Sequence, residues 1–372
     1  MALLAWCLSV TLDNIGNAAF VPKHEFPVFA SISVLRGLSV PYEAHRLVEG
    51  EVDGPETVIP IGNNQLMTFT KTGSISQISR TGGGKIEKQV NLGGKTRPLG
   101  AAFSEDGDLY IADAVRGLLK VSTENKVEVV ASSVGGSPIL YCNDVEVGTS
   151  SGAVYFTDST DIAPQPVTEN GRTTFDTLGA SILDVLRGSK KGRVLKYDPQ
   201  TKRTSIVVDG GIWFANGITV SKDETHALVC ETFAARVLKV DLSSGATSIF
   251  STDSFPGYCD GISYSPDELK VYVSVPSPPP KIMSLLEFLS DETGRVVRSL
   301  LMALPPYLRP KPVKAGLIIA LDATTGGIVE AYLDPHGEHF EMVSSVVENP
   351  EDSTELFIGT LTKDFVGVLK KK

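Results

Sequence analysis

A unit of two short apolar runs separated by a polar turn recurs along the chain. In one copy the two runs are residues 98–103 and 108–113, and similar copies open at Asn143, Asn216 and Asp260. In the first three copies, the opening residue and the acid that closes the second run are 15 positions apart. Apolar runs of this length, bounded by turn residues, are typical of β-strands, and the fixed spacing indicates a repeated β-hairpin.

The spacing of these units predicts how many there are. Weaker copies open at Glu56 and Glu341, so the intervals between successive openings are 42, 45, 73, 44 and 81 residues. Three intervals match the roughly 40 to 50 residues of one four-stranded propeller blade. The two longer intervals contain insertions near 159–191, where a helix is expected over 175–186, and near 276–312, where a proline-rich turn precedes an apolar stretch.

Two further strand-like runs follow the units, so each repeat supplies four short strands. The chain is therefore predicted to be an all-β, six-bladed β-propeller with four-stranded blades and short helical insertions. The propeller would occupy residues 46–372, after an N-terminal segment 1–45. A β-sandwich would not show a repeat of about 44 residues, and an α/β fold would place a helix after each strand.

The residues that open the six units are expected to meet at the centre of the ring. The first strand of each blade lines the central channel, so a residue at its start can point at the axis. Five of the six carry side-chain oxygens, which hard cations prefer, and calcium tolerates irregular geometry where magnesium requires an octahedron. Asn and Asp also open strands to bind turn backbone, which is the alternative at any single position. The six are Glu56, Pro98, Asn143, Asn216, Asp260 and Glu341.

Composition and charge narrow the classes of partner. The chain of 372 residues has a net charge of −10, which argues against nucleic acid, because a nucleic-acid-binding surface needs a basic face. An acidic balance fits cation binding, but it also simply aids solubility. The cysteines are too few for a disulfide framework and lack metal-site spacing, although the sequence still allows one disulfide. They are Cys7, Cys142, Cys230 and Cys259.

The N-terminus allows two interpretations. Residues 2–12 are mostly apolar and a small-residue stretch follows at 17–19, as in a weak signal peptide, but a basic start is missing and Asp13 interrupts the pattern. The apolar run is too short to span a bilayer, which takes about 20 residues. The segment is therefore either a targeting signal or a part of the folded core.

Short motifs spread over about residues 46–370 carry a family resemblance. They are residues 51–56, 97–100, 109–113, 117–118, 143–145, 154–159, 192–199, 214–217, 256–260 and 356–361. Together they resemble the strictosidine synthase-like proteins, a family related to the calcium-dependent lactonase, arylesterase and gluconolactonase propellers. The resemblance implies a six-bladed propeller and favours the endomembrane or secretory pathway.

The same resemblance implies one catalytic calcium ion (Ca2+). Its ligands would be Glu56, Asn143, Asn216 and Asp260, the four positions that the phase of the repeat also selects. The family usually reads Pro-Asp-Asn in the fifth blade, whereas Asp260 here is followed by Gly261, so one side-chain oxygen is lost. This loss is expected to weaken cation binding or to enlarge the pocket.

The sequence is compatible with three functions. A calcium-dependent hydrolase would act on a small-molecule ester, lactone or other apolar substrate, with Asp260 activating water or attacking directly and His339, or His336, shuttling a proton. The run 337–341 resembles the segment that carries the catalytic glutamate of the namesake enzymes, which condense an amine with an aldehyde without metal, and Glu341 is the matching residue. The third function is a non-catalytic binding propeller whose ion only holds the ring together.

The apolar stretch 282–307 is expected to form a lid over one face of the ring. Such a patch would line an apolar substrate pocket, make a peripheral contact with a membrane, or pack against the propeller.

Overall fold

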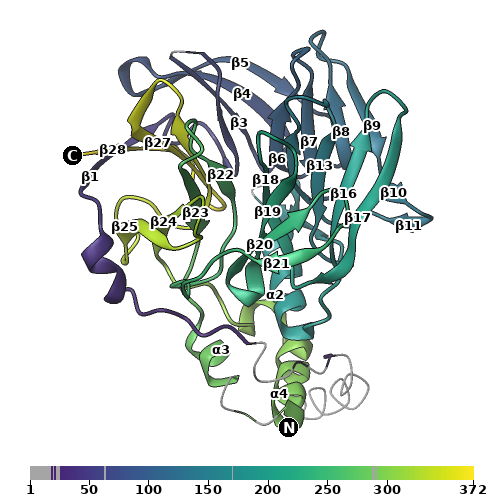
Figure 1. Ribbon diagram of the computed structural model, residues 1–372, viewed down its shortest axis with the longest axis vertical. Helices are drawn as coiled ribbons and strands as arrows, with labels where there is room; N and C mark the ends of the chain where they lie inside the picture. The colour runs from purple at the N-terminus through teal and green to yellow at the C-terminus, as the bar shows by residue number, and fades with distance from the viewer. Residues whose placement is uncertain are drawn as a thin grey trace.

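Six four-stranded antiparallel sheets follow one another along the chain, and the structure confirms the predicted six-bladed, all-β propeller (Figure 1). The computed structural model describes residues 18, 19, 21, 26–62, 64–169, 171–286, 289 and 291–372. The apolar run 2–12, Cys7 and three residues of the expected lid, 287, 288 and 290, lie outside this description.

The first three blades are formed by residues 58–212. Blade one is β2 (Val58–Pro60), β3 (Gln65–Phe69), β4 (Ser74–Ser79) and β5 (Lys85–Asn91). Blade two is β6 (Pro98–Phe103), β7 (Leu109–Asp113), β8 (Gly117–Val121) and β9 (Val127–Ala131). Blade three is β12 (Cys142–Val147), β13 (Val154–Asp158), β16 (Gly192–Asp198) and β17 (Arg203–Ile212).

The other three blades complete the ring. Blade four is β18 (Ala215–Val220), β19 (His226–Glu231), β20 (Arg236–Asp241) and β21 (Thr247–Ile249). Blade five is β22 (Ile262–Tyr264), β23 (Lys270–Val275), β24 (Gly316–Asp322) and β25 (Ile328–Asp334). Blade six is β26 (Val343–Asn349), β27 (Asp352–Thr360), β28 (Val366–Lys371) and β1 (Tyr42–Leu47).

A strand from the start of the described chain closes the ring. β1 pairs antiparallel with β28, from Tyr42 opposite Lys371 to Leu47 opposite Val366. The last blade is therefore built from both ends of the chain. This pairing covers the hydrogen-bonding edge that β28 would otherwise expose, and it holds the first and last blades together.

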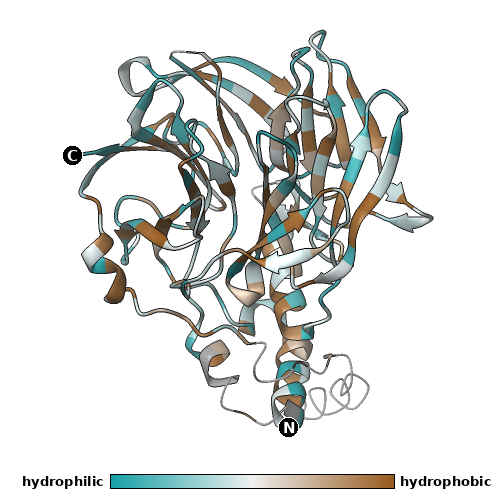
Figure 2. Cartoon of the chain, viewed as in Figure 1, coloured by the Kyte–Doolittle hydropathy of each residue, from teal (hydrophilic) through white to brown (hydrophobic). Residues whose placement is uncertain are grey.

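Apolar clusters lie between each pair of neighbouring blades, so every interface has its own core. The second strands supply much of it: β7, β13 and β19 are almost entirely buried. Figure 2 shows apolar and polar bands that alternate along several outer strands, as expected where only one strand face is covered. Cys142, Cys230 and Cys259 are buried and free.

Two insertions place helices at one end of the propeller (Figure 1). The first, within blade three, holds the hairpin β14 (Gln165–Glu169) and β15 (Arg172–Asp176), then α2 (Thr177–Arg187). The Asp176 side chain accepts a 2.7 Å hydrogen bond from the Gly179 N–H, and Gly188 ends α2 in the left-handed conformation. This helix lies where the sequence predicts one.

The second insertion, within blade five, holds α3 (Lys281–Leu286), α4 (Asp291–Ala303) and the 3₁₀ turn η5 (Pro306–Leu308). The buried Arg298 of α4 donates to the carbonyl oxygens of Leu186 and Ala19, at 3.1 and 2.8 Å, and so joins the two insertions into one cap. No helix of the described residues is long and apolar enough to cross a membrane. The remaining elements are η2 (Val34–Leu38), η3 (Thr81–Gly83), η4 (Thr232–Ala234), β10 (Ser133–Val134) and β11 (Ser137–Pro138).

Candidate metal centre and substrate cavity

Six residues, one from each blade, line the central channel at the start of the first strands. A β-bulge interrupts the pairing of β6, β12, β18 and β26 with their neighbours at this level, and it turns one residue of each toward the axis. The channel cavity has a volume of about 400 Å³. The six residues are Glu56, Leu99, Asn143, Asn216, Asp260 and Ser344.

This ring contains the four residues predicted as metal ligands, but it differs from the predicted set in two blades. Pro98 pairs with Asp113, the closing acid, just as Cys142 pairs with Asp158 one residue before Asn143. The turn of blade two is one residue shorter, so Leu99 takes the axial position there. In blade six the bulge falls at Ser344, three residues after Glu341. Blades two and six therefore offer no carboxylate or amide at this level.

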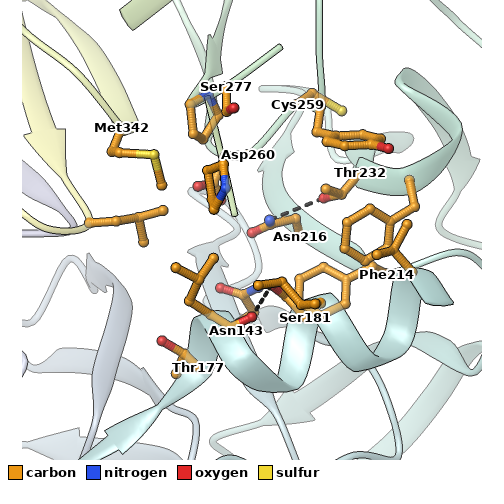
Figure 3. A pocket seen from close by; sticks show the side chains of 18 of the residues that line it. Asn143, Thr177, Ser181, Phe214, Asn216, Thr232, Cys259, Asp260, Ser277 and Met342 are labelled. Atoms are coloured by element: carbon orange, nitrogen blue, oxygen red, sulfur yellow. Dashed lines mark hydrogen bonds between the residues drawn. The ribbon is translucent and has the colours of Figure 1, made fainter. Parts of the chain in front are cut away.

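Each asparagine of the ring is oriented by a hydroxyl that directly follows the neighbouring strand. The Ser159 hydroxyl donates to the Ala215 carbonyl at 2.6 Å, so it can only accept from the Asn143 amide N–H, 2.8 Å away. The Asn216 amide N–H donates to the Thr232 hydroxyl at 3.1 Å (Figure 3). Both amides thus turn their Oδ1 atoms away from these hydroxyls and toward the cavity that they line.

Of the two carboxylates of the ring, Glu56 pairs with an arginine. Arg97, also buried, donates from a guanidinium nitrogen to Glu56 Oε2 at 2.9 Å. Burial raises the pKa of Glu56, and the charge and hydrogen bond of Arg97 oppose that rise. Burial raises the pKa of Asp260 well above its usual value, the Glu56 charge adds to the rise, and a hydrogen bond from Asn216 opposes it. No basic side chain of the described chain pairs with Asp260.

This donor set fits a hard divalent cation. No group of three or more His, Cys, Asp and Glu side chains among the described residues is placed to hold a metal. The ring instead offers two carboxylates and two amide oxygens, which calcium accepts readily. The pKa of Asp260 is raised because this second carboxylate is buried without a counter-charge. A cation between Glu56 and Asp260 would supply that counter-charge.

An apolar cavity of about 120 Å³ lies between this ring and the cap. Four aromatic rings form one wall in sequence, with centroids of neighbouring rings 5.1 to 5.4 Å apart. They are Tyr141, Phe214, Phe233 and Tyr258. α2 contributes Leu178, Ile182 and Val185 to the lining, and Met283 of α3 joins them. Figure 3 shows Asn216 and Asp260 in the same cavity as the labelled apolar side chains Phe214 and Met342.

On the other side of the ring, two acids face the channel. Asp144 follows Asn143 in the bulge and accepts hydrogen bonds from the backbone N–H groups of Val145 and Ile218, both at 2.9 Å. Burial raises the pKa of Asp144 and the pKa of Glu146 to about 7. The channel is thus acidic on one side of the ring, and the cavity is apolar on the other.

The two other predicted catalytic residues lie outside the cavity. His339 is exposed, and its ring packs edge-on against Tyr42, 6.3 Å away between centroids. Glu341 is buried beneath Lys363, with which it forms an ion pair, and Lys314 lies 3.5 Å from its Oε2. The predicted alternative shuttle, His336, is also exposed. The structure brings none of these three into the cavity that Asp260 lines.

The acids that close the second strands hold the start of their own blade's first strand. Asp113 accepts from the backbone N–H of Arg97, Asp158 from that of Tyr141 and Glu231 from that of Trp213, at 2.8 to 2.9 Å. They are structural and act within a blade.

Sequence reasoning missed the residues that surround the ring. Arg97 stands beside Pro98 with no pattern of its own to mark it. The hydroxyls do carry a signal: Ser159 and Thr232 each follow the closing acid, 16 positions after an asparagine of the ring. Blade two has Ala114 at the corresponding place, after Asp113, and there the axial residue is apolar.

Comparison with known proteins agrees with this architecture. Residues 143–244 match the family model described as strictosidine synthase. Protein STRICTOSIDINE SYNTHASE-LIKE 7 of Arabidopsis thaliana is 36% identical over 193 residues, which is 52% of this chain but only 47% of that protein. The adipocyte plasma membrane-associated protein of Salmo salar is 31% identical over 347 residues, 87% of this chain and 77% of that protein.

Solved structures show the same fold at low sequence identity. A gluconolactonase from Xanthomonas campestris superposes with a TM-score of 0.58 at 13% identity, covering 93% of this chain and 95% of that one. The chain therefore belongs to the strictosidine synthase-like family of six-bladed propellers, together with the adipocyte plasma membrane-associated proteins.

Proposed function

We propose that this chain is a calcium-dependent hydrolase of esters or lactones. The observation that carries the proposal is the ring of four oxygen-bearing side chains at the floor of an apolar cavity. Glu56, Asn143, Asn216 and Asp260 would hold the ion. When bound, calcium would polarise the substrate carbonyl and stabilise the negative charge that develops on its oxygen.

Asp260 is the residue best placed for the proton chemistry. It lies at the boundary between the ring and the cavity, where a carboxylate can accept a proton from a water molecule beside the substrate. In hydrolysis it would accept a proton from a water molecule whose oxygen forms the new bond to the carbonyl carbon, while the bond to the leaving oxygen breaks. That leaving oxygen would take the proton back from Asp260.

The walls of the cavity define what it can accept. Aromatic and aliphatic side chains surround the floor, so an apolar acyl, aryl or lactone ring would be bound by contact and by exclusion of water. The alternative condensing chemistry has less support, because its candidate residue Glu341 is ion-paired to Lys363 outside the cavity.

The test measures calcium binding and turnover separately. Chelator-treated protein is titrated with calcium by calorimetry, and a panel of aryl esters, alkyl esters and lactones is assayed with and without the ion. We expect one site, activity that chelation removes, and loss of both in Asp260→Ala. Glu341→Gln serves as the control and keeps both. Calcium binding that raises thermal stability without any turnover would leave a non-catalytic propeller instead.

We also propose a peripheral membrane contact through residues 282–307. Tyr307, and Leu308 directly after this segment, are 70% and 51% exposed at the end of the cap, and the adipocyte plasma membrane-associated proteins of Salmo salar and Homo sapiens carry plasma membrane association in their name. Exposed apolar residues beside basic ones favour the interface of a lipid bilayer. In vesicle flotation, Tyr307→Ser with Leu308→Ser should reduce the bound fraction, and an unchanged fraction would exclude this surface.

A further inference from the structure

A third cavity, of about 440 Å³, opens beside the substrate cavity and shares part of its wall. We call it the vestibule. Residues of α2, of the segment after η5 and of the loop before β26 line both cavities, so the two spaces adjoin at these side chains. The shared residues are Leu178, Ile182, Pro310, Pro312 and Met342.

Basic side chains line the vestibule on a chain that is acidic as a whole. Arg309, Lys311 and Lys314 face it, and residues 281–314 carry six Lys and Arg against three Asp and Glu, although the whole chain has a net charge of −10. Lys311 is exposed, and no carboxylate of the described residues pairs with it. The Lys314 side chain is 65% exposed.

The acids of the vestibule are already engaged. Asp176 caps α2 through the Gly179 N–H, and Glu341 is ion-paired with Lys363, a further basic residue at this edge. Lys314 lies 3.5 Å from the same Glu341 carboxylate, but most of its side chain faces solvent. The vestibule therefore keeps an excess of positive charge available to a ligand.

The floor of the substrate cavity has the opposite character. Glu56 and Asp260 lie there with only Arg97 as a basic partner, and Asp144 adds a third carboxylate just below. Without a bound cation, an anionic group would be repelled from this floor and attracted to the vestibule, and an apolar body would fill the space between. The basic lining of the vestibule thus favours one orientation of an elongated ligand in the cation-free chain.

We propose that the vestibule binds the anionic end of an amphiphilic substrate, a carboxylate or a phosphate group, whose apolar body occupies the cavity above Asp260. The inference rests on the proposed function only in placing an ester or lactone carbonyl at the opposite end. It assigns the substrate class as anionic amphiphiles rather than neutral esters.

Binding of unreactive probes tests this without turnover. Calorimetry in the presence of a chelator compares decanoate, decyl phosphate and neutral decanol, all kept monomeric, on the full chain. We expect the double variant Lys311→Glu with Lys314→Glu to bind both anionic probes about tenfold more weakly and to bind decanol unchanged. Weakening of only one anionic probe would support the proposal and identify the preferred head group.

The matched control carries the same change of charge at a distance. Lys126→Glu with Lys202→Glu alters two exposed lysines in turns of blades two and three, and it should bind all three probes like the parent chain. An equal loss for decanol and the anions, or no loss for any probe, would overturn the proposal. Since no calcium or hydrolysis is involved, a chain inactive on every ester could still pass this test. Conversely, an active enzyme could fail it.

Discussion

Blades three and four differ from blades two and six at the same level of the channel. Blades three and four each present an asparagine braced by a hydroxyl, Ser159 or Thr232, that follows the closing acid. Blade two presents Leu99, with Ala114 at the place of the hydroxyl. Blade six presents Ser344, whose hydroxyl donates to the Glu56 carbonyl at 2.7 Å. A ligand of the proposed cation would thus consist of two parts, an oxygen donor and the group that orients it.

The largest effect is expected at Arg97, which blade two supplies in place of a ligand. In the presence of a chelator, the substitution Arg97→Met should lower the free energy of unfolding by about 3 kcal/mol, because the substitution leaves the Glu56 carboxylate buried without a partner. Calcium should then stabilise the variant more than the parent chain, since the ion replaces the lost counter-charge. Denaturant unfolding with and without calcium measures both. The exposed Arg203→Met is the control, and a variant as stable as the parent without calcium would contradict the role of the pair.

The second effect tests the donor itself. Asn216→Ala removes one of four side-chain oxygens, so calcium affinity should fall about 100-fold, close to 2.7 kcal/mol. Hydrolysis at subsaturating calcium should fall with it. Calorimetric titration gives the affinity, and Asn91→Ala, at the outer end of blade one, should leave it unchanged. If Asn216→Ala binds calcium as the parent does, the ring is not the binding site.

The third effect is a pH dependence of stability that arises from blade three alone. Blade three has Asp144 after its asparagine, whereas blade four has Gly217 at the same place. The pKa of Asp144 is raised from 3.8 to about 7, so between these values the folded protein holds a proton that the unfolded chain has lost. Stability should therefore fall as pH rises from 4 to 7. Asp144→Asn should flatten this fall by about 2 kcal/mol, less than the full shift implies because the side chain faces the channel.

This pH dependence is measured by urea unfolding in chelator at several pH values. The slope between pH 4 and pH 7 is the quantity to compare, because the substitution also changes a backbone hydrogen bond at all pH values. A variant with the parent slope would mean that Asp144 ionises normally in the folded protein.

The smallest effect is expected from the hydroxyl groups that orient the two asparagines of the ring. Thr232→Val keeps the shape of the side chain but removes the hydroxyl that orients the Asn216 amide, so calcium affinity should fall about tenfold. Ser159→Ala should behave alike in blade three. The exposed Thr225→Val provides the control. Unchanged affinity in both variants would show that the asparagines keep their orientation without the hydroxyls.

The fold could be predicted from the sequence because its signals are local and repeated. Each hairpin carries its own apolar runs, turn residues and closing acid, so the repeat reveals the blades without any knowledge of distant contacts. The same phase selected Glu56, Asn143, Asn216 and Asp260, and the structure places all four around one cavity. It does so because a residue at a fixed place in each blade faces the axis in every blade.

Only the tertiary structure decided the rest of the site. A turn shorter by one residue put Leu99 rather than Pro98 at the axis, and a bulge put Ser344 there rather than Glu341. The pairing of Glu56 with Arg97, the apolar wall from α2 and the basic vestibule join residues from different blades and insertions. The sequence determined which residues could face the channel, whereas packing between distant segments decided which of them meet, because register and contact depend on backbone geometry that no local pattern records.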